Sequence, residues 1–292
     1  MSLLDDVSIV VTPNGYKAGE LYAVIRIDYT GGGCPHILAE PQRTNIVFPS
    51  DVAVTQTRTV TAAEYTLSFY GTGSIVLSGT HSATLTGTGV NDRIDLTFTP
   101  SAGSLVLTVS GTVTNFQLEV GSYATSLIPT ASGQVTRNQD IFTRDGVGSL
   151  INSTEGVLFV EVNPLHLSAT NRYITIFDSS NVLNKIHIKF EANLNIQVRY
   201  YVNDVVSFTA SYVQSDFTNI KIALKWKAND FALWISGNEE ASQLSGTVNA
   251  DSTFDTLSLA YTSGILNFNG EVKQLQVYDT ALTDVQLAAL TS

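Results

Sequence analysis

The chain has 292 residues, which suits two domains, and 43% of its residues are hydrophobic, which is enough for packed cores. Only 14% are charged, and the net charge is −11. Binding to a phosphate backbone requires clustered lysine and arginine, so this composition excludes nucleic acid as an expected partner.

The N-terminal 50 residues form an irregular arm, with strands expected at residues 7–11 and 21–27. The chain starts with MSLLDDVSIVV, which has acids where a secretory signal has a basic region. No apolar run approaches the ~18 residues of a membrane span, so no membrane insertion is expected. Cys34 is the single cysteine, which rules out an internal disulfide framework.

Residues 51–120 contain short alternating runs that predict half-buried strands of a first β-sandwich of the jelly-roll type. Tyr65, Leu67 and Phe69 share one face of the clearest run, and turn-forming residues separate it from the next runs. Tyr70 is out of phase with Phe69, so we expect its ring to be exposed and available to a ligand.

Residues 121–155 are rich in serine, threonine, glycine and proline, and we interpret them as an ordered linker. Residues 156–292 then repeat the strand pattern and predict a second antiparallel β-sandwich in tandem with the first. Its clearest strand places Ile220, Ile222, Leu224 and Trp226 on one face.

One short helix is expected at the C-terminus. Thr283 and Gln286 form a capping box, and Leu282 and Leu287 occupy the positions of a hydrophobic staple around it. Asp284 in the first turn complements the helix dipole. A helix of ~8 residues is unstable alone, so it should dock on the sandwich.

Several segments resemble phage and prophage tail or fibre proteins, in which a carbohydrate-binding-module-like jelly roll precedes a laminin-G/concanavalin-A-like domain. The resemblance implies the second sandwich is of that type, and that the protein forms a homo-oligomer, with a trimer as first expectation. The segments that carry it are Cys34-Pro35 with Leu38, Glu40 to Asn45, Phe116 to Glu119, Gly121, Ala124 to Ser126, Ile128 to Thr130, Thr136-Arg137 and Lys273 to Leu287.

No pattern of a known catalytic centre occurs. The four histidines lack metal-ligand spacing, and no strand carries the alternating carboxylates typical of glycosidases on a concanavalin-like sandwich. The adjacent Glu239 and Glu240 point to opposite faces of an extended strand. We therefore expect a protein that is not an enzyme.

Aromatic residues are the stronger signal, because sugar rings stack on tryptophan and tyrosine while polar groups fix their hydroxyls. Trp234 is the first candidate, since it is out of phase with Leu233 and Ile235 and should face away from the core. Tyr200 and Tyr201 must point to opposite faces, so one of them can be accessible. The predicted ligand-binding residues are Trp234, Tyr201, Trp226, Tyr200, Arg199, Asn203 and Tyr70.

Calcium is a common structural ion in both fold types that the resemblance implies. Glu119 ends the last strand of the first sandwich, where such modules often bind calcium, with Glu40 or Asn45 as partners from the first loop. An ordinary hydrogen-bonded glutamate is the alternative interpretation.

The resemblance implies a phage virion protein of the tail-fibre, receptor-binding or head-fibre type. Such a protein is made in the bacterial cytoplasm, lies on the exterior of the particle, and binds host surface glycans and other virion proteins. Two alternatives stay open. The first is a purely structural decoration protein whose sandwiches mediate oligomer contacts, and the second, weaker one is a glycan hydrolase.

Overall fold

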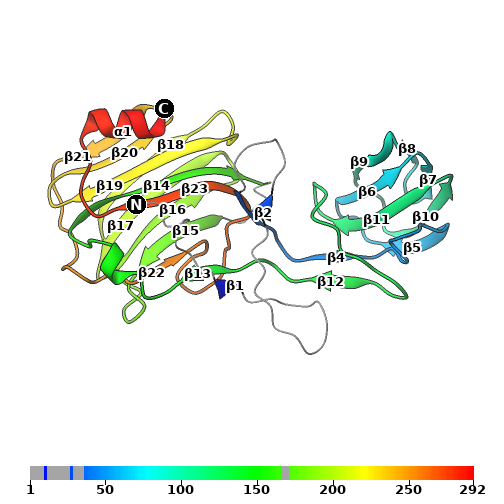
Figure 1. Cartoon of the computed structure of the whole chain (residues 1–292), viewed down its shortest axis with the longest axis horizontal. Helices are drawn as coiled ribbons and strands as arrows, with labels where there is room; N and C mark the ends of the chain where they lie inside the picture. The colour runs from blue at the N-terminus through cyan, green and yellow to red at the C-terminus, as the bar shows by residue number, and fades with distance from the viewer. Residues whose placement is uncertain (1–9, 12–26, 29–35, 166–170) are drawn as a thin grey trace. The chain divides into compact units, whose positions relative to one another are not determined.

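A computed structural model describes residues 10–11, 27–28, 36–165 and 171–292. These residues form antiparallel strands and one short C-terminal α-helix, which confirms the expected all-β class (Figure 1). Most of the expected N-terminal arm, including the strand at residues 21–26 and Cys34, lies outside the described residues.

The chain folds into two compact units, and the smaller one is inserted into the larger one. The smaller unit contains Pro41–Gln139, while the larger unit combines Asp140–Ser292 with the described residues before Pro41. This division differs from the expected boundaries at 50, 120 and 155. The expected linker of residues 121–155 contains strands of both units, which are too short to show a period in the sequence.

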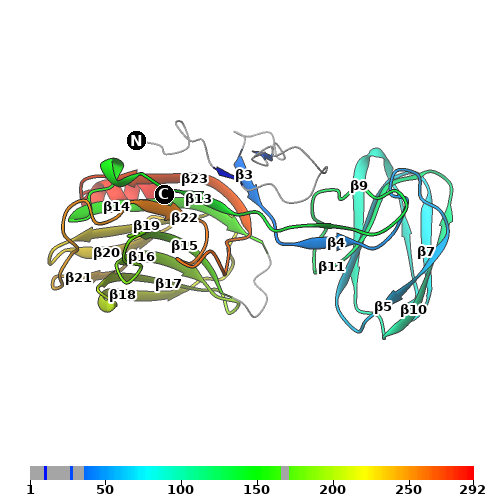
Figure 2. The ribbon, with the colours of Figure 1, turned by 90° about the horizontal axis from the view of Figure 1, so that it is seen from below.

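The larger unit contains two seven-stranded sheets. The first has the order β1-β13-β22-β15-β16-β17-β18 (Figure 2). Its strands are β1 (Val10–Val11), β13 (Phe142–Arg144), β15 (Arg172–Phe177), β16 (Lys185–Phe190), β17 (Asn195–Val202), β18 (Val205–Val213) and β22 (Thr256–Ser258).

The second sheet has the order β2-β3-β23-β14-β19-β20-β21. It includes β3, which pairs with β23 although the two lie at opposite ends of the described chain. Its strands are β2 (Ile27–Asp28), β3 (His36–Ala39), β14 (Glu155–Pro164), β19 (Ile220–Lys227), β20 (Phe231–Ile235), β21 (Asn238–Gln243) and β23 (Gly270–Tyr278). The short 3-10 helix η1 (Gly148–Leu150) precedes β14.

The main core lies between these two sheets. Alternate residues of β15 and β16, such as Ile174 and Ile188, are fully buried there. Ile222, Leu224 and Trp226 of β19 join the same core, as the alternation in the sequence predicts. The larger unit is therefore a two-sheet sandwich in which each sheet also has an outer face.

Helix α1 (Asp284–Thr291) covers the outer face of the second sheet. Its capping box is present: the Thr283 hydroxyl accepts the Gln286 amide, and the Gln286 side chain accepts the Thr283 amide. Leu287 is fully buried beside Phe159 of β14, and this burial anchors a helix too short to be stable alone. No helix in the described ranges is long and apolar enough to cross a membrane.

The smaller unit has its own core, which includes Leu67, Phe69 and Phe116. Its sheets have the orders β5-β10-β7-β8, β11-β6-β9 and β12-β4. The strands are β4 (Arg43–Asn45), β5 (Gln56–Val60), β6 (Tyr65–Gly71), β7 (Ser74–Gly79), β8 (Ala83–Thr86), β9 (Gly89–Phe98), β10 (Gly103–Ser110), β11 (Val113–Val120) and β12 (Val135–Arg137).

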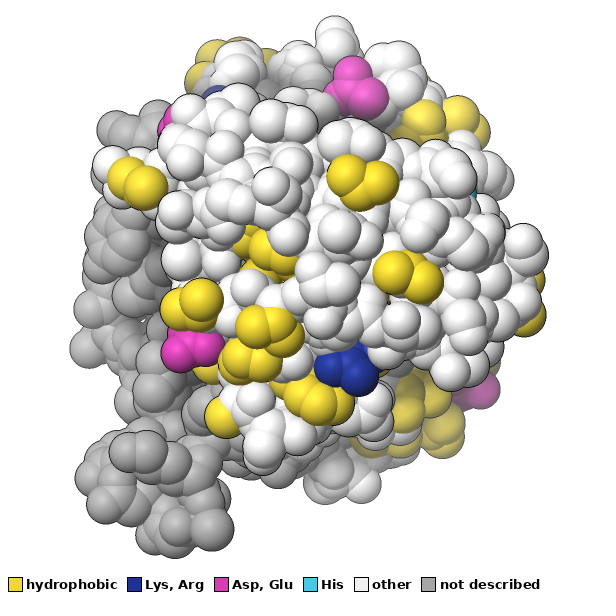
Figure 3. All heavy atoms as spheres, turned by 90° about the vertical axis from the view of Figure 1, so that its right-hand side faces the viewer, with side chains coloured by type: hydrophobic (Ala, Val, Ile, Leu, Met, Phe, Trp, Pro, Cys, Tyr) yellow, Lys and Arg dark blue, Asp and Glu magenta, His cyan; other side chains and the backbone are white. Residues whose placement is uncertain are grey.

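The outer surface of the four-stranded sheet is made of uncharged residues. Thr57, Thr59, Thr108, Thr84 and Ser78 are exposed along four neighbouring strands. Figure 3 shows the side of the molecule that carries this unit, and charged side chains are sparse on it. The low charge content of the sequence is therefore visible as a hydroxyl-rich surface.

A buried polar cluster joins β4, β11 and the segment after β11; we call Arg43, Asn45, Gln117, Glu119 and Thr125 the latch. Asn45 donates to two backbone carbonyls, at 3.0 Å each, and accepts two backbone amides. Glu119 accepts the Thr125 amide at 2.8 Å and its hydroxyl at 2.6 Å. Every latch residue except Arg43 is fully buried, so these bonds hold the segment in place.

The glycine after β11 makes the close approach of Arg43 feasible. Gly121 has φ +146°, and a Cβ at this position would lie 2.6 Å from a terminal nitrogen of Arg43. The guanidinium of Arg43 in turn lies 3.7 Å from Glu119. Many residues that carry the resemblance to phage proteins thus belong to this structural cluster.

Candidate functional site

The outer face of the first sheet carries polar and aromatic side chains, and no helix of the described residues covers it. The residues of β15, β16 and β17 that alternate with the core residues point to this side. We call this surface the polar face; it consists of Tyr173, Thr175, Lys185, His187, Lys189, Gln197, Arg199 and Tyr201, with Tyr261 from the loop after β22.

His187 is the centre of an aromatic cluster on the polar face. Its ring centroid lies 5.2 Å from that of Tyr173, 5.6 Å from that of Tyr201 and 6.2 Å from that of Tyr261. The rings of Tyr173 and Tyr261 are 4.9 Å apart. Tyr173 and Tyr261 are half-buried, so part of each ring is accessible for stacking.

Three cations surround this cluster. Lys185 lies 3.2 Å from Asp204 and 4.4 Å from the centroid of the Tyr201 ring. Lys189 pairs with Glu191 at 2.5 Å.

Glu191 also accepts from Asn195, and hydrogen bonds from Asn195 and Lys189 hold the pKa of its carboxyl below the ordinary value. Glu191 is therefore an ionised partner of Lys189 at neutral pH.

Arg199 differs from the two lysines. It donates to the Tyr201 hydroxyl at 3.0 Å and has no ion-pair partner within the residues that the structure describes. Its guanidinium is half-buried and always charged. The charge of Arg199 also helps to lower the pKa of Glu191, but no carboxylate of the described residues forms an ion pair with it, so its guanidinium can bind an anionic group of a ligand.

Several buried polar atoms of the polar face have no hydrogen-bond partner in the described part of the protein. They are Oγ1 of Thr175, both ring nitrogens of His187, Oε1 of Gln197 and Nε of Arg199. Each such atom costs about 1–3 kcal/mol if it stays unpaired. Four neighbouring residues with this defect mark a surface that is not optimised for stability.

His187 is neutral at physiological pH. Burial lowers the pKa of its imidazole to about 3, with Arg199, Lys189 and Lys185 adding smaller repulsive contributions. A neutral imidazole has one donor and one acceptor nitrogen, and both nitrogens of His187 are buried without a partner among the described residues.

Two of the predicted aromatic residues, Tyr200 and Trp226, lie in the core. Tyr200 and Trp226 are fully buried between the sheets, so the prediction that they contact a ligand is wrong. The Tyr200 hydroxyl donates to the Ser153 carbonyl, and burial raises the pKa of Tyr200 to about 12. Trp226 donates to the Asn152 carbonyl at 3.1 Å. Both residues are satisfied core aromatics.

Trp234 faces away from the main core, as the sequence predicts, but the expectation that its ring is exposed is wrong. Only 8% of the residue is accessible, because helix α1 places Leu287 and its neighbours over the same face. Alternation in a strand predicts the face of a side chain and gives no information on what covers that face.

Tyr201 and Arg199 are the predicted residues that the polar face brings together. Asn203 lies nearby in the turn after β17, with φ +48°, and its side chain accepts from Asn181. Tyr70 belongs to the smaller unit; it is half-buried on the opposite face from Phe69, as its phase predicts. Their contact with a ligand remains a prediction.

The residues expected to bind calcium do not fit that ion. All hydrogen-bonding positions of the Asn45 amide are used by backbone groups, and both carboxylate oxygens of Glu119 accept protein donors. A calcium ion needs six to eight oxygen ligands. Glu40 belongs to the larger unit, where its amide bonds the Asp140 side chain. The described ranges contain no cluster of metal-binding side chains.

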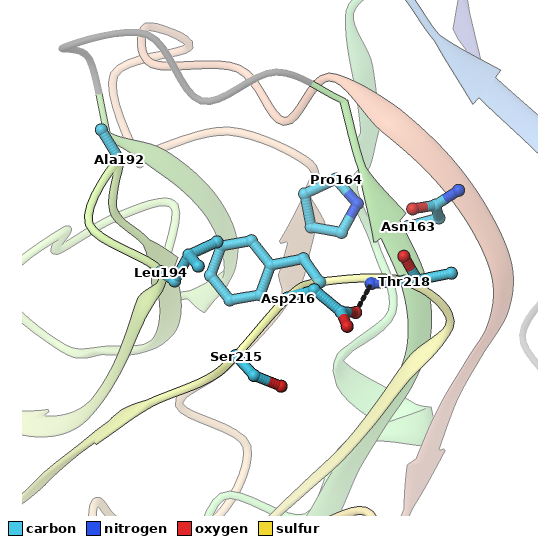
Figure 4. A pocket seen from close by; sticks show the side chains of 8 residues that line it. Asn163, Pro164, Ala192, Leu194, Ser215, Asp216 and Thr218 are labelled. Atoms are coloured by element: carbon cyan, nitrogen blue, oxygen red, sulfur yellow. Dashed lines mark hydrogen bonds between the residues drawn. The ribbon is translucent and has the colours of Figure 1, made fainter.

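A pocket of about 310 Å³ lies at the end of the sandwich (Figure 4). Phe217, Leu194 and Pro164 contribute apolar surface, and Asp216 lies beside them with one oxygen accepting the Thr218 amide. Its volume is at the lower limit for ligand pockets. The pocket lacks the cations and unpaired polar atoms of the polar face.

Sequence reasoning missed Tyr173, His187, Lys189, Gln197 and Tyr261. A signal for two of them, His187 and Lys189, was present, because Lys185-Ile-His-Ile-Lys-Phe190 alternates polar and apolar residues along one strand. Tyr173 and Tyr261 lie far apart in sequence and meet only through the pairing of β15 with β22.

The fold and this surface define an all-β protein whose larger unit is a sandwich with one open polar and aromatic face. No family model matches the sequence, and no curated protein matches it. Structural similarity was found to the Ruminococcus gnavus IT-sialidase CBM40, with 15% identity and a TM-score of 0.44 over 52% of this chain and 93% of that one.

Two further structures are similar. The leech intramolecular trans-sialidase has 18% identity and a TM-score of 0.41, over 48% of this chain and 23% of that one. A pentraxin of Limulus polyphemus has 16% identity and a TM-score of 0.37, over 49% of this chain and 71% of that one. Identities below 20% and TM-scores below 0.5 carry no functional argument, so the function is inferred from the side chains of the polar face.

Proposed function

We propose that the protein is a non-enzymatic glycan-binding module and that the polar face is its binding surface. The observation that supports this proposal is the set of unpaired polar groups on Thr175, His187, Gln197 and Arg199 beside accessible tyrosine rings. Tyrosine faces stack on the C–H surface of a sugar, while the partly accessible side chains of Gln197 and Arg199 bind the polar groups of the sugar.

The charges of this surface favour a sugar that carries a carboxylate. Arg199 has no ion pair among the described residues, and Lys185 and Lys189 lie on the same face. Asp204 and Glu191 pair with the two lysines, so Arg199 supplies the positive charge that no ion pair of the described residues balances. Charge-assisted bonds from arginine to a carboxylate are among the strongest in recognition.

The test compares acidic oligosaccharides, such as sialyllactose, with their neutral counterparts by calorimetry. We expect the full-length chain to bind the acidic ones, and Arg199→Ala to weaken that binding by about tenfold or more, the equivalent of 1.5–3 kcal/mol. Lys227→Ala is the matched control, because Lys227 is an exposed cation that pairs with Glu155 on the other sheet. Equal affinity for acidic and neutral sugars would contradict the charge preference.

We further propose that this module acts on the exterior of a phage particle made in a bacterial host, where it recognises host glycans. The support is the resemblance of the latch segments and the C-terminal segment to tail and fibre proteins. Mass spectrometry of purified particles from the encoding phage or prophage tests the location. The structural alternative gains support if the chain is in the particle and no glycan in an array binds it.

A further inference from the structure

The two sandwich sheets end in edge strands of different character. β1 and β2 are two residues long, whereas β18 and β21 are long edges of the first and second sheet. β21, with the sequence NEEASQ, carries Glu239 and Glu240. β18, with the sequence VVSFTASYV, carries no charged residue and no proline. Charges and prolines on an edge prevent pairing with other chains, so β21 has such protection and β18 lacks it.

The outward hydrogen-bonding groups of β18 can be identified. The Gln214 amide donates to the Leu194 carbonyl, so even-numbered residues at this end of β18 direct their backbone toward β17. Thr209, Ser211 and Val213 therefore direct their N–H and C=O groups away from the sheet, and their side chains are exposed. No described residue pairs with these backbone groups.

The start of β18 is already occupied. The Ser207 carbonyl accepts the Gln243 side chain, and the Ser207 hydroxyl contacts the backbone of Thr247. The free part of the edge is therefore Thr209 to Val213. Val213 within it is 64% accessible, and two further apolar side chains outside it are exposed, Val205 at 69% and Leu244 at 83%.

We propose that β18 pairs antiparallel with β18 of a second copy of this chain, around a two-fold axis through Ser211. A second copy of β18 is a suitable partner, because the free N–H and C=O groups of one strand match those of the same strand in the reversed direction, and neither strand carries a charge. Two copies with a net charge of −11 each repel, and β18 itself adds no charge at the contact, although Glu240 of β21 hydrogen-bonds the Tyr212 side chain beside it. The axis lies normal to the sheet, so the polar faces of both copies lie on the same side.

The first test is the mass of the full-length chain by light scattering at tens of micromolar. We expect the mass of two chains. Ser211→Lys places two lysines opposite each other in the paired edge and should reduce the mass to that of one chain. Ser242→Lys in β21 is the matched control, an exposed serine on the other edge, and should leave the dimer intact.

The second test does not depend on a disruptive variant. Cys34 is replaced by serine and Ser211 by cysteine, and the protein is oxidised under mild conditions. Symmetric pairing predicts rapid cross-linking of Ser211→Cys and little cross-linking of Ser242→Cys. A monomeric chain, a trimer, or equal masses for Ser211→Lys and the unchanged protein would overturn the proposal. Circular dichroism of each variant verifies that it is folded.

Discussion

The latch of the smaller unit and the polar face of the larger unit are both built from buried polar residues on strands, but their hydrogen bonding differs. Asn45, Gln117 and Glu119 have partners for their side-chain oxygens and nitrogens, and Nε of Arg43, which lies 3.7 Å from Glu119, is the one buried latch atom without a hydrogen bond among the described residues. Thr175 and His187 have none in the described ranges. A satisfied cluster stabilises a fold, whereas an unsatisfied one loses stability that a ligand can restore. Burial of polar residues alone does not identify a binding site. The informative observation is whether the buried polar atoms have hydrogen-bond partners within the protein.

The largest expected effect is the loss of a latch residue. Asn45→Ala leaves two carbonyls and two amides without partners in a fully buried position. We expect the free energy of unfolding of the smaller unit to fall by about 4 kcal/mol or more. Denaturant titration followed by circular dichroism measures this loss. A change below about 1 kcal/mol would mean that the latch is not a structural cluster.

Trp234 sharpens the comparison, because its Nε1 is also buried without a partner but the ring lies beneath helix α1. Trp234→Ala should therefore destabilise the larger unit by about 3–5 kcal/mol through the cavity it leaves. Calorimetric melting and glycan binding are measured on the same sample. A loss of glycan binding with an unchanged melting temperature would show that Trp234 contacts the ligand.

The same substitution, threonine to valine, should affect stability differently at two sites. Thr125→Val removes the hydroxyl that donates to Glu119 at 2.6 Å, so we expect a loss of about 1–3 kcal/mol. Thr175→Val replaces an unpaired buried hydroxyl by a methyl group, so stability should stay equal or rise by about 1 kcal/mol. Both melting curves are recorded in one buffer. Destabilisation by both would show that Thr175 has a partner in solution.

The stability of the larger unit should also depend on pH through His187, with a modest effect per pH unit. The pKa of His187 is about 3 in the folded protein and near 6.5 when unfolded, so protonation favours unfolding. This contribution is fully present above pH 6.5 and is lost as the pH falls toward 3, at up to about 1.4 kcal/mol per pH unit. His187→Gln should flatten the stability curve in this window. An identical slope in both proteins would exclude His187 as its source.

The sequence predicted the secondary structure better than the site. Alternation placed Ile222, Leu224 and Trp226 in the core, and the capping box of Thr283 predicted the helix. The insertion of the smaller unit was not predicted, because β3 and β23 carry no signal of their pairing. Trp234 was misjudged because the docking position of a helix depends on tertiary contacts. His187, Tyr173 and Tyr261 meet only after distant strands have paired.

The insertion has a consequence for the order of folding. β3 is synthesised early and has to find β23, which emerges near the other end of the described chain. The entropic cost of closing a loop grows with its length. Folding of the smaller unit pairs Arg43 with Arg137 and draws its two ends together, which shortens the effective loop. We therefore expect the smaller unit to fold first during synthesis, so that damage to its latch delays the sandwich that it interrupts.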